Sequence, residues 1–212
     1  MITVIIPILN EEKTIVNVVR SIEKNKLVDE IIIVDDKSVD KSVELAKDLN
    51  VRIITSTKLG KGASMRDGLL LAKNDIIIFL DGDIKKYSKG FINKIAKPLI
   101  SGTHDFIKTT FNREAGRVTE LVAKPLLSLL FPELTTFSQP LSGIIAGRKK
   151  YFEQISFEDD YGVDIGILID MYQLGVRMTE VKIGKIEHKM KLWQELGNMS
   201  KDVSKAILKR SS

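Results

Sequence analysis

The sequence predicts an α/β fold in which a mostly parallel, mixed sheet is flanked by helices. In its amino-terminal half, short runs rich in β-branched residues alternate with amphipathic helical stretches. Runs that are apolar on both faces and separated by helices are typical of parallel strands joined by crossover connections. Polar residues follow each run, as expected where a ligand lies at the carboxyl edge of such a sheet.

The first strand is expected over residues 3–7, which read Thr-Val-Ile-Ile-Pro, and a helix over 12–25 follows it. The alternation then repeats, because each later apolar run has the length of a strand and each intervening segment has helical periodicity. The expected strands are 30–34, 52–55 and 76–80, and the expected helices are 40–50 and 61–73. This order favours a nucleotide-binding type of layout.

The alternation loosens after residue 83, where the sheet is expected to become mixed. Helices are expected over 88–100, 117–130 and 164–174, and strands over 106–111, 143–147 and 179–184, with a polar, turn-rich segment over 132–140. The length of the chain suits one domain with a substantial core and makes two full domains improbable.

The carboxyl-terminal segment, 191–210, reads as an exposed helix with a frayed tail. Its apolar positions recur at helical spacing: Leu192, Leu196, Met199, Val203 and Ile207. Such a face packs either on the domain or on a partner subunit. We therefore expect a single domain over 1–190, with halves 1–84 and 85–190, and a helical extension over 191–212.

The composition narrows the classes of protein. The chain is 43% hydrophobic and 29% charged, which is ordinary for a soluble domain, and no apolar stretch is long enough to span a bilayer. The first apolar run contains Pro7 and leads into Asn10-Glu11-Glu12 rather than a cleavage site, so a cytoplasmic location is the default expectation. The net charge of +5 suits an acidic substrate, but the lysines are scattered and no nucleic-acid partner is expected.

The most informative segment is Asp81-Gly82-Asp83, which follows the apolar run 76–80. Two carboxylates separated by one glycine can meet one hard divalent cation, which usually also takes phosphate oxygens of a substrate. The chain has no cysteine, so Asp, Glu and the two histidines are the plausible ligands, and Mg²⁺ or Mn²⁺ fits best. The same tripeptide is also an ordinary strand-ending turn.

Each of the other expected parallel strands also leads to polar or glycine residues. The segments are Asn10-Glu11-Glu12, Asp35-Asp36-Lys37-Ser38 and Gly60-Lys61-Gly62. Helix capping explains Asn10 or Ser38 alone, and a turn explains either glycine alone. Because a purely structural explanation needs a separate coincidence at every strand, the four segments together favour a ligand site.

These segments resemble the nucleotide-sugar half of GT-A glycosyltransferases, whose fold is a Rossmann-like α/β sheet. The downstream half resembles glucosyl-3-phosphoglycerate synthases more specifically. Its matching segments are Gly116-Arg117-Val118-Thr119-Glu120-Leu121, Phe131-Pro132-Glu133-Leu134, Gln139-Pro140-Leu141-Ser142-Gly143 and Tyr161-Gly162-Val163-Asp164-Ile165-Gly166. The resemblance implies a retaining transferase that moves glucose from a nucleoside diphosphate sugar to 3-phosphoglycerate.

The resemblance also implies roles on the donor side. Pro7, Leu9 and Glu11 would line the nucleoside pocket, with Asp35 and Asp36 near the base or ribose. In the same comparison Lys61 would neutralise the diphosphate, which suits lysine because a flexible point charge follows phosphate oxygens as a bond breaks.

The resemblance implies that Asp81 and Asp83 hold the cation and that His188 is the third protein ligand. We expect Asp83, Lys61 and Asp164 to take part in the chemistry. His104 matches no residue of the family motif, and we expect it to be structural.

For the acceptor, Gly116, Arg117 and Thr119 stand at the start of an expected helix, where free amides and the positive dipole end attract phosphate. An arginine there can bind phosphate with two parallel hydrogen bonds. Two positions depart from the family: Asp164 replaces its usual Glu, and Met190 replaces its usual Asn. These departures affect the expected contacts with sugar and acceptor.

Three functions therefore stay open at the level of sequence. The leading hypothesis is the retaining transferase, expected to be a homodimer as its relatives are. The second is an inverting GT-A enzyme acting on a polyprenyl phosphate or another acceptor, with a general base from Glu158-Asp159-Asp160. The third is a catalytically silent nucleotide-sugar-binding module. The donor base, uracil or guanine, and the sugar, glucose or mannose, are not determined.

Overall fold

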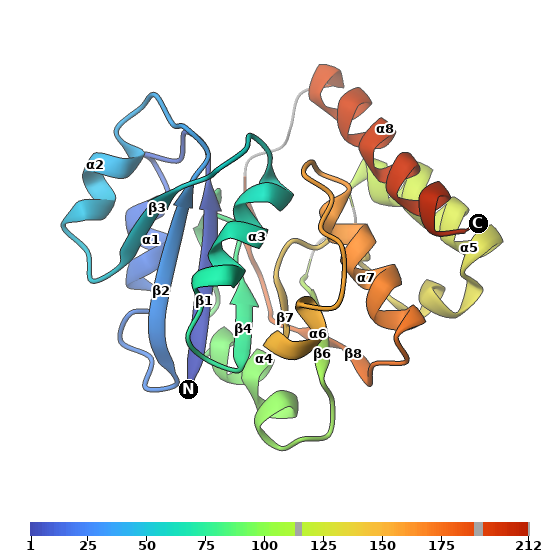
Figure 1. Cartoon of the computed structure of the whole chain (residues 1–212), viewed down its shortest axis with the longest axis horizontal. Helices are drawn as coiled ribbons and strands as arrows, with labels where there is room; N and C mark the ends of the chain where they lie inside the picture. Colours follow the sequence, from blue (N-terminus) through green and yellow to red (C-terminus); the bar gives the residue numbers. More distant parts are fainter. Residues whose placement is uncertain (113–115, 189–192, 212) are drawn as a thin grey trace.

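The computed structural model describes residues 1–112, 116–188 and 193–211. A seven-stranded sheet runs through the molecule (Figure 1). Its strands are β1 (Ile2–Ile8), β2 (Val28–Asp35), β3 (Arg52–Thr55), β4 (Ile76–Phe79), β6 (Phe106–Thr110), β7 (Ile145–Arg148) and β8 (Met178–Lys182). The strand order is β3-β2-β1-β4-β7-β6-β8. Among the described strands of this sheet, only β7 runs antiparallel to its neighbours. The predicted mostly parallel, mixed sheet is confirmed.

Helices cover both faces of this sheet, and strand residues alternate between the two cores, as the period of two along a strand requires. In β1, Val4 and Ile6 face one core while Ile5 faces the other. The first core is closed by α1 (Ile15–Arg20), α2 (Ser42–Lys47) and α4 (Phe91–Ile100). The second is closed by α3 (Lys61–Leu71), α5 (Lys124–Leu130), α6 (Lys149–Phe152), α7 (Val163–Gln173) and α8 (Trp193–Arg210).

The order of the first four strands fixes the place of a ligand site. The chain steps outward from β1 to β2 and β3, then returns to place β4 on the other side of β1. The strand order therefore reverses between β1 and β4, and a crevice forms where the loops after these two strands separate. The crevice lies at the carboxyl ends of these strands.

The first helix is shorter than the predicted 12–25 and covers only Ile15–Arg20. The amides just before it bind side chains of the next loop instead: Glu11 N–H donates to Ser42 Oγ at 2.7 Å, and Glu12 N–H donates to Asp40 Oδ2 at 3.1 Å. The segment is thereby held as a loop beside the crevice.

Three short elements were not predicted. They are α6 and the pair β5 (Ile84–Lys86) and β9 (Glu187–His188), which form a separate two-stranded sheet. Strands this short carry no readable period of two, and β9 pairs with a partner about a hundred residues earlier. Only the tertiary fold brings them together.

The segment 117–130 is helical as predicted but is not a uniform α-helix. It contains a π-helical turn, η1 (Thr119–Ala123), before α5, and a 3₁₀ turn, η2 (Pro132–Thr136), comes after α5. A π-turn widens the helix locally and is found disproportionately at functional sites.

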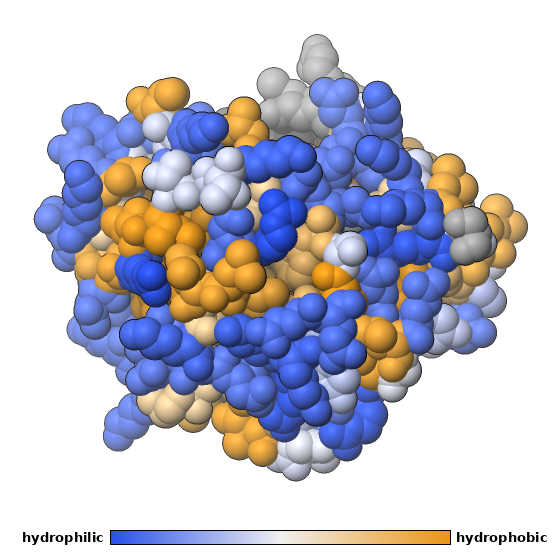
Figure 2. Space-filling view, in the orientation of Figure 1, coloured by the Kyte–Doolittle hydropathy of each residue, from blue (hydrophilic) through white to orange (hydrophobic). Residues whose placement is uncertain are grey.

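The helix α8 packs on the domain, which decides between the two alternatives left open by its periodicity. It contacts α7, α5 and η1, and Val203, Ala206 and Ile207 are almost fully buried. Figure 1 places it at the opposite end of the molecule from β3, and Figure 2 shows its outer face as mostly hydrophilic. Among the described residues, every helix is too short or too polar to cross a lipid bilayer.

Candidate active site

A cavity of about 730 Å³ opens at the carboxyl ends of β1 and β4, between the two halves of the sheet. Its volume is in the range of small-molecule sites. Eleven of the thirteen residues expected at the site line it: Pro7, Leu9, Glu11, Asp36, Lys61, Asp81, Asp83, Gly116, Arg117, Thr119 and Asp164. The structure therefore brings the expected donor and acceptor residues to one cavity.

The other two expected residues are Asp35, which lies away from the cavity wall, and His188, which the structure describes only in its backbone. Asp35 does not line the cavity, and its Oδ1 accepts a hydrogen bond from Ser38 N–H at 3.1 Å within the turn after β2. The backbone of His188 pairs with Ile84, the residue after Asp83, but its side chain lies outside the described residues. Met190 also lies outside them.

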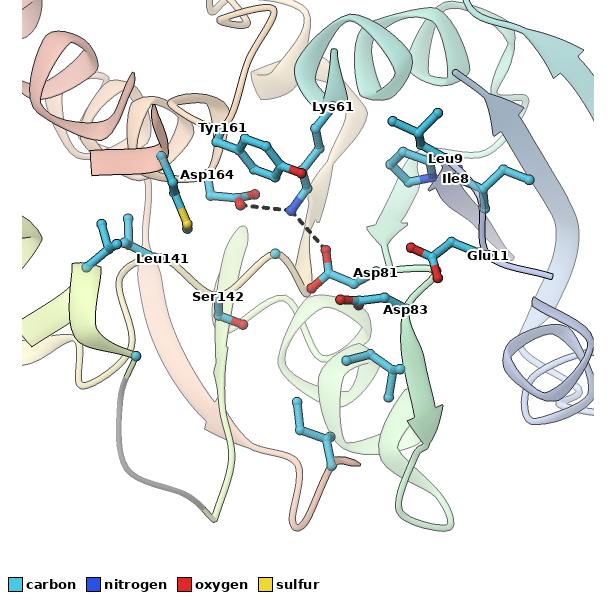
Figure 3. Close-up of a pocket in the computed structure, with 18 of the residues that line it drawn as sticks. Ile8, Leu9, Glu11, Lys61, Asp81, Asp83, Leu141, Ser142, Tyr161 and Asp164 are labelled. Atoms are coloured by element: carbon cyan, nitrogen blue, oxygen red, sulfur yellow. Dashed lines mark hydrogen bonds and ion pairs between the residues drawn. The ribbon is translucent and has the colours of Figure 1, made fainter. Parts of the chain in front are cut away.

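Lys61 stands at the centre of the cavity and joins its two sides. Its Nζ donates to Asp81 Oδ1 at 2.9 Å and to Asp164 Oδ2 at 2.8 Å, as Figure 3 shows. Burial opposes the charge of this lysine, but the two carboxylates outweigh burial and raise the pKa of Lys61 above its ordinary value. Lys61 is therefore a fixed positive charge where the donor side meets the acceptor side.

Two glycines explain why Lys61 fits there. Gly60 has φ of +124°, and a Cβ on it would fall 2.1 Å from the carbonyl oxygen of Asp159. A Cβ on Gly143 would fall 2.3 Å from Lys61 Nζ and 2.2 Å from Asp81 Oδ1. Any side chain at either position would displace the backbone or the ion pair.

The amino end of α3 offers few free amides to a phosphate. Gly62 N–H and Ala63 N–H donate to the carbonyl of Asp159, and Gly60 N–H donates to the carboxylate of Asp36. The side chain of Lys61 is therefore the main positive charge that this end of the helix presents to the cavity. Burial raises the pKa of Asp36, whose carboxylate both lines the cavity and holds this turn.

The loops after β1 and β2 are tied to each other and form the outer wall of the donor side. Asn10 has a left-handed φ of +59°, accepts at Oδ1 from Val39 N–H, and donates its own N–H to Ser38 Oγ. Asn10 and Ser38 therefore hold the two loops together, and they neither cap a described helix nor line the cavity.

The turn after β4 places Asp81 and Asp83 on the cavity wall beside Glu11 (Figure 3). Burial, and then the neighbouring charge of Asp83, raises the pKa of Glu11 to about 7, so these carboxylates repel one another. An all-oxygen set of this kind fits a hard divalent cation. No group of three potential ligand side chains close enough for a metal occurs among the described residues.

Gly116, Arg117 and Thr119 lie across the cavity, where the helical segment begins and passes into the π-turn. Glu120 N–H bonds back to Gly116 carbonyl oxygen at 3.0 Å, and Thr119 is buried while Arg117 is exposed. Arg117 and the start of the helical segment at Gly116 therefore border the same cavity, which suits a phosphorylated ligand.

Sequence reasoning gave no site role to several cavity residues, although Ser142 and Tyr161 stand in the segments that carry the family resemblance. They are Ser64, Ser142, Tyr161, Leu196 and Met199. The last two come from α8, so the carboxyl-terminal helix forms part of the wall. Their helical spacing was visible, but nothing in the sequence indicates what that face covers.

Lys108 of β6 was also missed. It is fully buried, its Nζ donates to the backbone oxygen of Asp164 at 2.7 Å, and burial lowers its pKa to about 7. A lysine inside a strand ordinarily reads as an exposed edge residue. Here its buried amine holds the first turn of α7, from which Asp164 reaches Lys61.

The run Glu158-Asp159-Asp160 does not line the cavity. Glu158 pairs with Arg210 at 2.6 Å, Asp159 pairs with Lys58 and Arg66, and Asp160 accepts from Gly162 N–H. Carboxylates held this way are structural, so the base suggested for an inverting enzyme is not at the cavity. His104 is half-buried in the turn after α4, and its Nδ1 hydrogen-bonds Thr103 Oγ1 at 3.1 Å.

Comparisons with known proteins agree with this fold. Residues 3–155 match the model of glycosyl transferase family 2. The chain is 34% identical to glucosyl-3-phosphoglycerate synthases of Mycobacterium tuberculosis and of Petrotoga mobilis, over 99% of this chain and 73% of each relative.

Solved structures show the same similarity. A crystal structure of the Mycobacterium tuberculosis glucosyl-3-phosphoglycerate synthase with Mn²⁺, uridine diphosphate glucose and phosphoglyceric acid is 35% identical, with a TM-score of 0.95. The match covers 100% of this chain and 79% of that one. Sequence, fold and cavity agree, and the chain is a glycosyltransferase that belongs to the glucosyl-3-phosphoglycerate synthase family.

Proposed function

We propose that this chain transfers glucose from uridine diphosphate glucose to 3-phosphoglycerate, with retention at the anomeric carbon and with Mg²⁺ or Mn²⁺ as cofactor. The observation that carries the proposal is Lys61, which bonds Asp81 on the donor side and Asp164 on the acceptor side of one cavity. The relatives named above support the choice of donor and acceptor.

On the donor side, Pro7, Leu9 and Glu11 border the space for the nucleoside, and Asp36 stands at its edge. Lys61 supplies positive charge to the diphosphate, and its two carboxylate partners keep it protonated. Asp81 and Asp83, with His188 from the neighbouring strand β9, would hold the cation. When bound, the cation acts as a Lewis acid for the departing diphosphate.

On the acceptor side, Arg117 binds the phosphate of 3-phosphoglycerate, with the helix start at Gly116 and the hydroxyl of Thr119 beside it. Lys61 and Asp164 then position the sugar between the two ligands. Binding of both substrates in one cavity lowers the entropy cost of the encounter, which is a large part of transferase catalysis.

The contacts that the candidate carboxylates make favour retention over inversion. An inverting enzyme needs a general base beside the attacking hydroxyl. The run suggested for that role is engaged in ion pairs outside the cavity, and Asp164 is paired with Lys61. In the proposed front-face reaction the leaving diphosphate oxygen takes the proton of the acceptor hydroxyl, and no protein base is required.

We also propose that the protein works in the cytoplasm, where both substrates are made, and as a homodimer. Light scattering on the purified full chain tests the subunit number, and a mass equal to one chain, 23.8 kDa, would contradict the dimer.

A matrix of donors and acceptors tests the activity. The purified protein with Mn²⁺ is given uridine or guanosine diphosphate glucose or mannose, each with and without 3-phosphoglycerate. Release of uridine diphosphate that depends on both glucose donor and 3-phosphoglycerate is expected, with an α-linked product by nuclear magnetic resonance. Donor binding without release under any condition would indicate the silent module, and a β-linked product the inverting enzyme.

A further inference from the structure

Two buried polar atoms lack a hydrogen-bond partner among the described residues: Ser64 Oγ and Asp164 Oδ1. Ser64 is fully buried and Asp164 is 3% exposed. A buried polar group without a partner is costly, and native proteins seldom leave one unless a water, an ion or a ligand completes it. Finding both such atoms at one site calls for a single cause.

Both residues belong to the wall of the same cavity and flank the same lysine. Ser64 lies one turn after Lys61 on α3, and residues three apart share a helix face. Asp164 touches Lys61 through its other oxygen, Oδ2. The two unpartnered atoms thus belong to residues that line one cavity with Lys61, the charge proposed to face the donor diphosphate.

The chemistry of the pair restricts the ligand. The serine hydroxyl can donate or accept, whereas the ionised carboxylate oxygen only accepts. A diphosphate has no proton to give Asp164 at neutral pH, and so can complete only the serine. A hexose carries hydroxyls that both donate and accept, so neighbouring sugar hydroxyls can complete both atoms.

We infer that Ser64 is a donor-sugar-binding residue, whose hydroxyl bonds a hydroxyl of the transferred hexose while Asp164 Oδ1 accepts from the same sugar. This deepens the proposed function and rests on it. Ser64 would contribute to the choice of sugar, because one hydroxyl moved by epimerisation loses its partner.

The alternative is an ordered water that completes Ser64 in the absence of any ligand. The two explanations predict different effects of Ser64→Ala on the stability of the ligand-free protein. A serine that waits for the sugar contributes nothing to folding, so Ser64→Ala leaves the unfolding temperature unchanged or raises it. A serine held by a structural water stabilises the fold, so Ser64→Ala lowers that temperature.

The test compares binding of uridine diphosphate glucose and of uridine diphosphate by isothermal titration calorimetry with Mn²⁺, for the wild type and Ser64→Ala. We expect the variant to bind the glucose donor about 3- to 10-fold more weakly, the effect of one lost neutral hydrogen bond, and to bind the diphosphate as the wild type does. Ser128→Ala, an exposed helix serine bonded to its own backbone, serves as the matched control and should change neither affinity.

Equal weakening of both ligands would overturn the inference and assign Ser64 to the diphosphate. Unchanged affinities together with a lower unfolding temperature would also overturn it and assign Ser64 to a structural water. In both cases the transferase activity of the wild type would still stand. Absence of glucose-donor binding by the wild type would instead contradict the proposed function, and this inference with it.

Discussion

The two halves of this cavity are built in different ways. The donor half takes its residues from the ends of neighbouring strands, as Asp81 and Asp83 follow β4 directly. The acceptor half is assembled by contacts between distant segments, such as Arg210 of α8 with Glu158 and Asp170. The donor half is therefore set by local sequence, and the acceptor half by tertiary packing.

This difference predicts how each half responds to mutation. Donor-half residues carry function at little cost to folding, because they sit on strand-end loops of a sheet that forms without them. Acceptor-half residues combine both roles, because buried charges that hold the fold also fix the residues facing the ligand. The following predictions test that separation.

The largest effect is expected for the double substitution Asp81→Asn and Asp83→Asn in the donor half. Loss of the cation's carboxylates should lower metal-dependent transfer by roughly 100- to 1,000-fold, since a Lewis acid supplies several kcal/mol. The free energy of unfolding should change by less than about 1 kcal/mol, because relief of the repulsion with Glu11 offsets the lost ion pair between Asp81 and Lys61. Product release and urea unfolding measure the two effects, and a marked loss of stability would contradict the separation.

Arg210→Met, in the acceptor half, should instead lower the stability of the fold. Arg210 is nearly buried and pairs with Asp170 at 2.6 Å as well as with Glu158, so its removal leaves two carboxylates without their partner. We expect a loss of about 2–4 kcal/mol in the free energy of unfolding. Urea unfolding monitored by circular dichroism measures it.

Lys209→Met is the matched control for Arg210→Met. Lys209 is the adjacent residue, contacts the same Glu158 at 3.3 Å, and is largely exposed. An exposed pair contributes little, so less than about 0.5 kcal/mol is expected. Equal losses for the two variants would show that burial of the ion pair is not what anchors α8.

Lys108 makes the acceptor half sensitive to pH. Burial lowers its pKa to about 7, while the unfolded chain keeps the ordinary value of 10.5. Between these values the unfolded state binds more protons, so stability rises with pH. The wild type should gain about 2 kcal/mol over Lys108→Met between pH 7 and pH 9. A constant difference between the two proteins in urea unfolding would refute a neutral Lys108.

Arg117→Ala should separate the two ligands. Loss of its charge should raise the KM for 3-phosphoglycerate about 10-fold and leave the affinity for the nucleotide donor unchanged. Steady-state kinetics and donor titration measure the two quantities. Arg52→Ala, an exposed arginine on β3, is the control. Weaker donor binding would indicate that Arg117 contacts the donor rather than the acceptor.

The smallest effect is expected for Glu11→Gln. Burial and Asp83 raise the pKa of Glu11 to about 7, so the folded state holds this proton longer and the wild type loses stability as pH rises from 4.5 to 7. Glutamine removes that loss. Because Glu11 is only half buried, the variant should gain about 1 kcal/mol over the wild type between pH 5 and pH 8. The exposed Glu44→Gln should show no such gain.

The sequence predicted the structure correctly wherever the structure depends on the pattern of contiguous residues. The apolar runs gave every strand of the large sheet to within a few residues, because strands buried on both faces need unbroken β-branched residues. The strand-end rule then placed Asp81, Lys61 and Glu11 in one cavity. Asp35 shows its limit, since side chains alternate direction and only Asp36 of that pair reaches the cavity.

Other features had no local signal. Strands β5 and β9 are too short for a pattern, Lys108 looks like a surface residue, and Ser64 looks like any helix serine. Each gains its role from a partner far along the chain, as Lys108 does from the oxygen of Asp164. The wall that α8 adds through Leu196 and Met199 is of the same kind.

By itself the sequence determined the fold class, the order of the strands along the chain and most of the strand-end residues that line the cavity, because hydrophobic period and strand-end polarity are properties of contiguous segments. The tertiary structure alone decided that α8 closes the cavity and that Lys61 meets both Asp81 and Asp164. It alone buried the hydroxyl of Ser64 without a hydrogen-bond partner in the described part of the chain. The physical reason is that burial and the pairing of charges depend on which distant segments exclude water together, which no contiguous stretch of residues specifies.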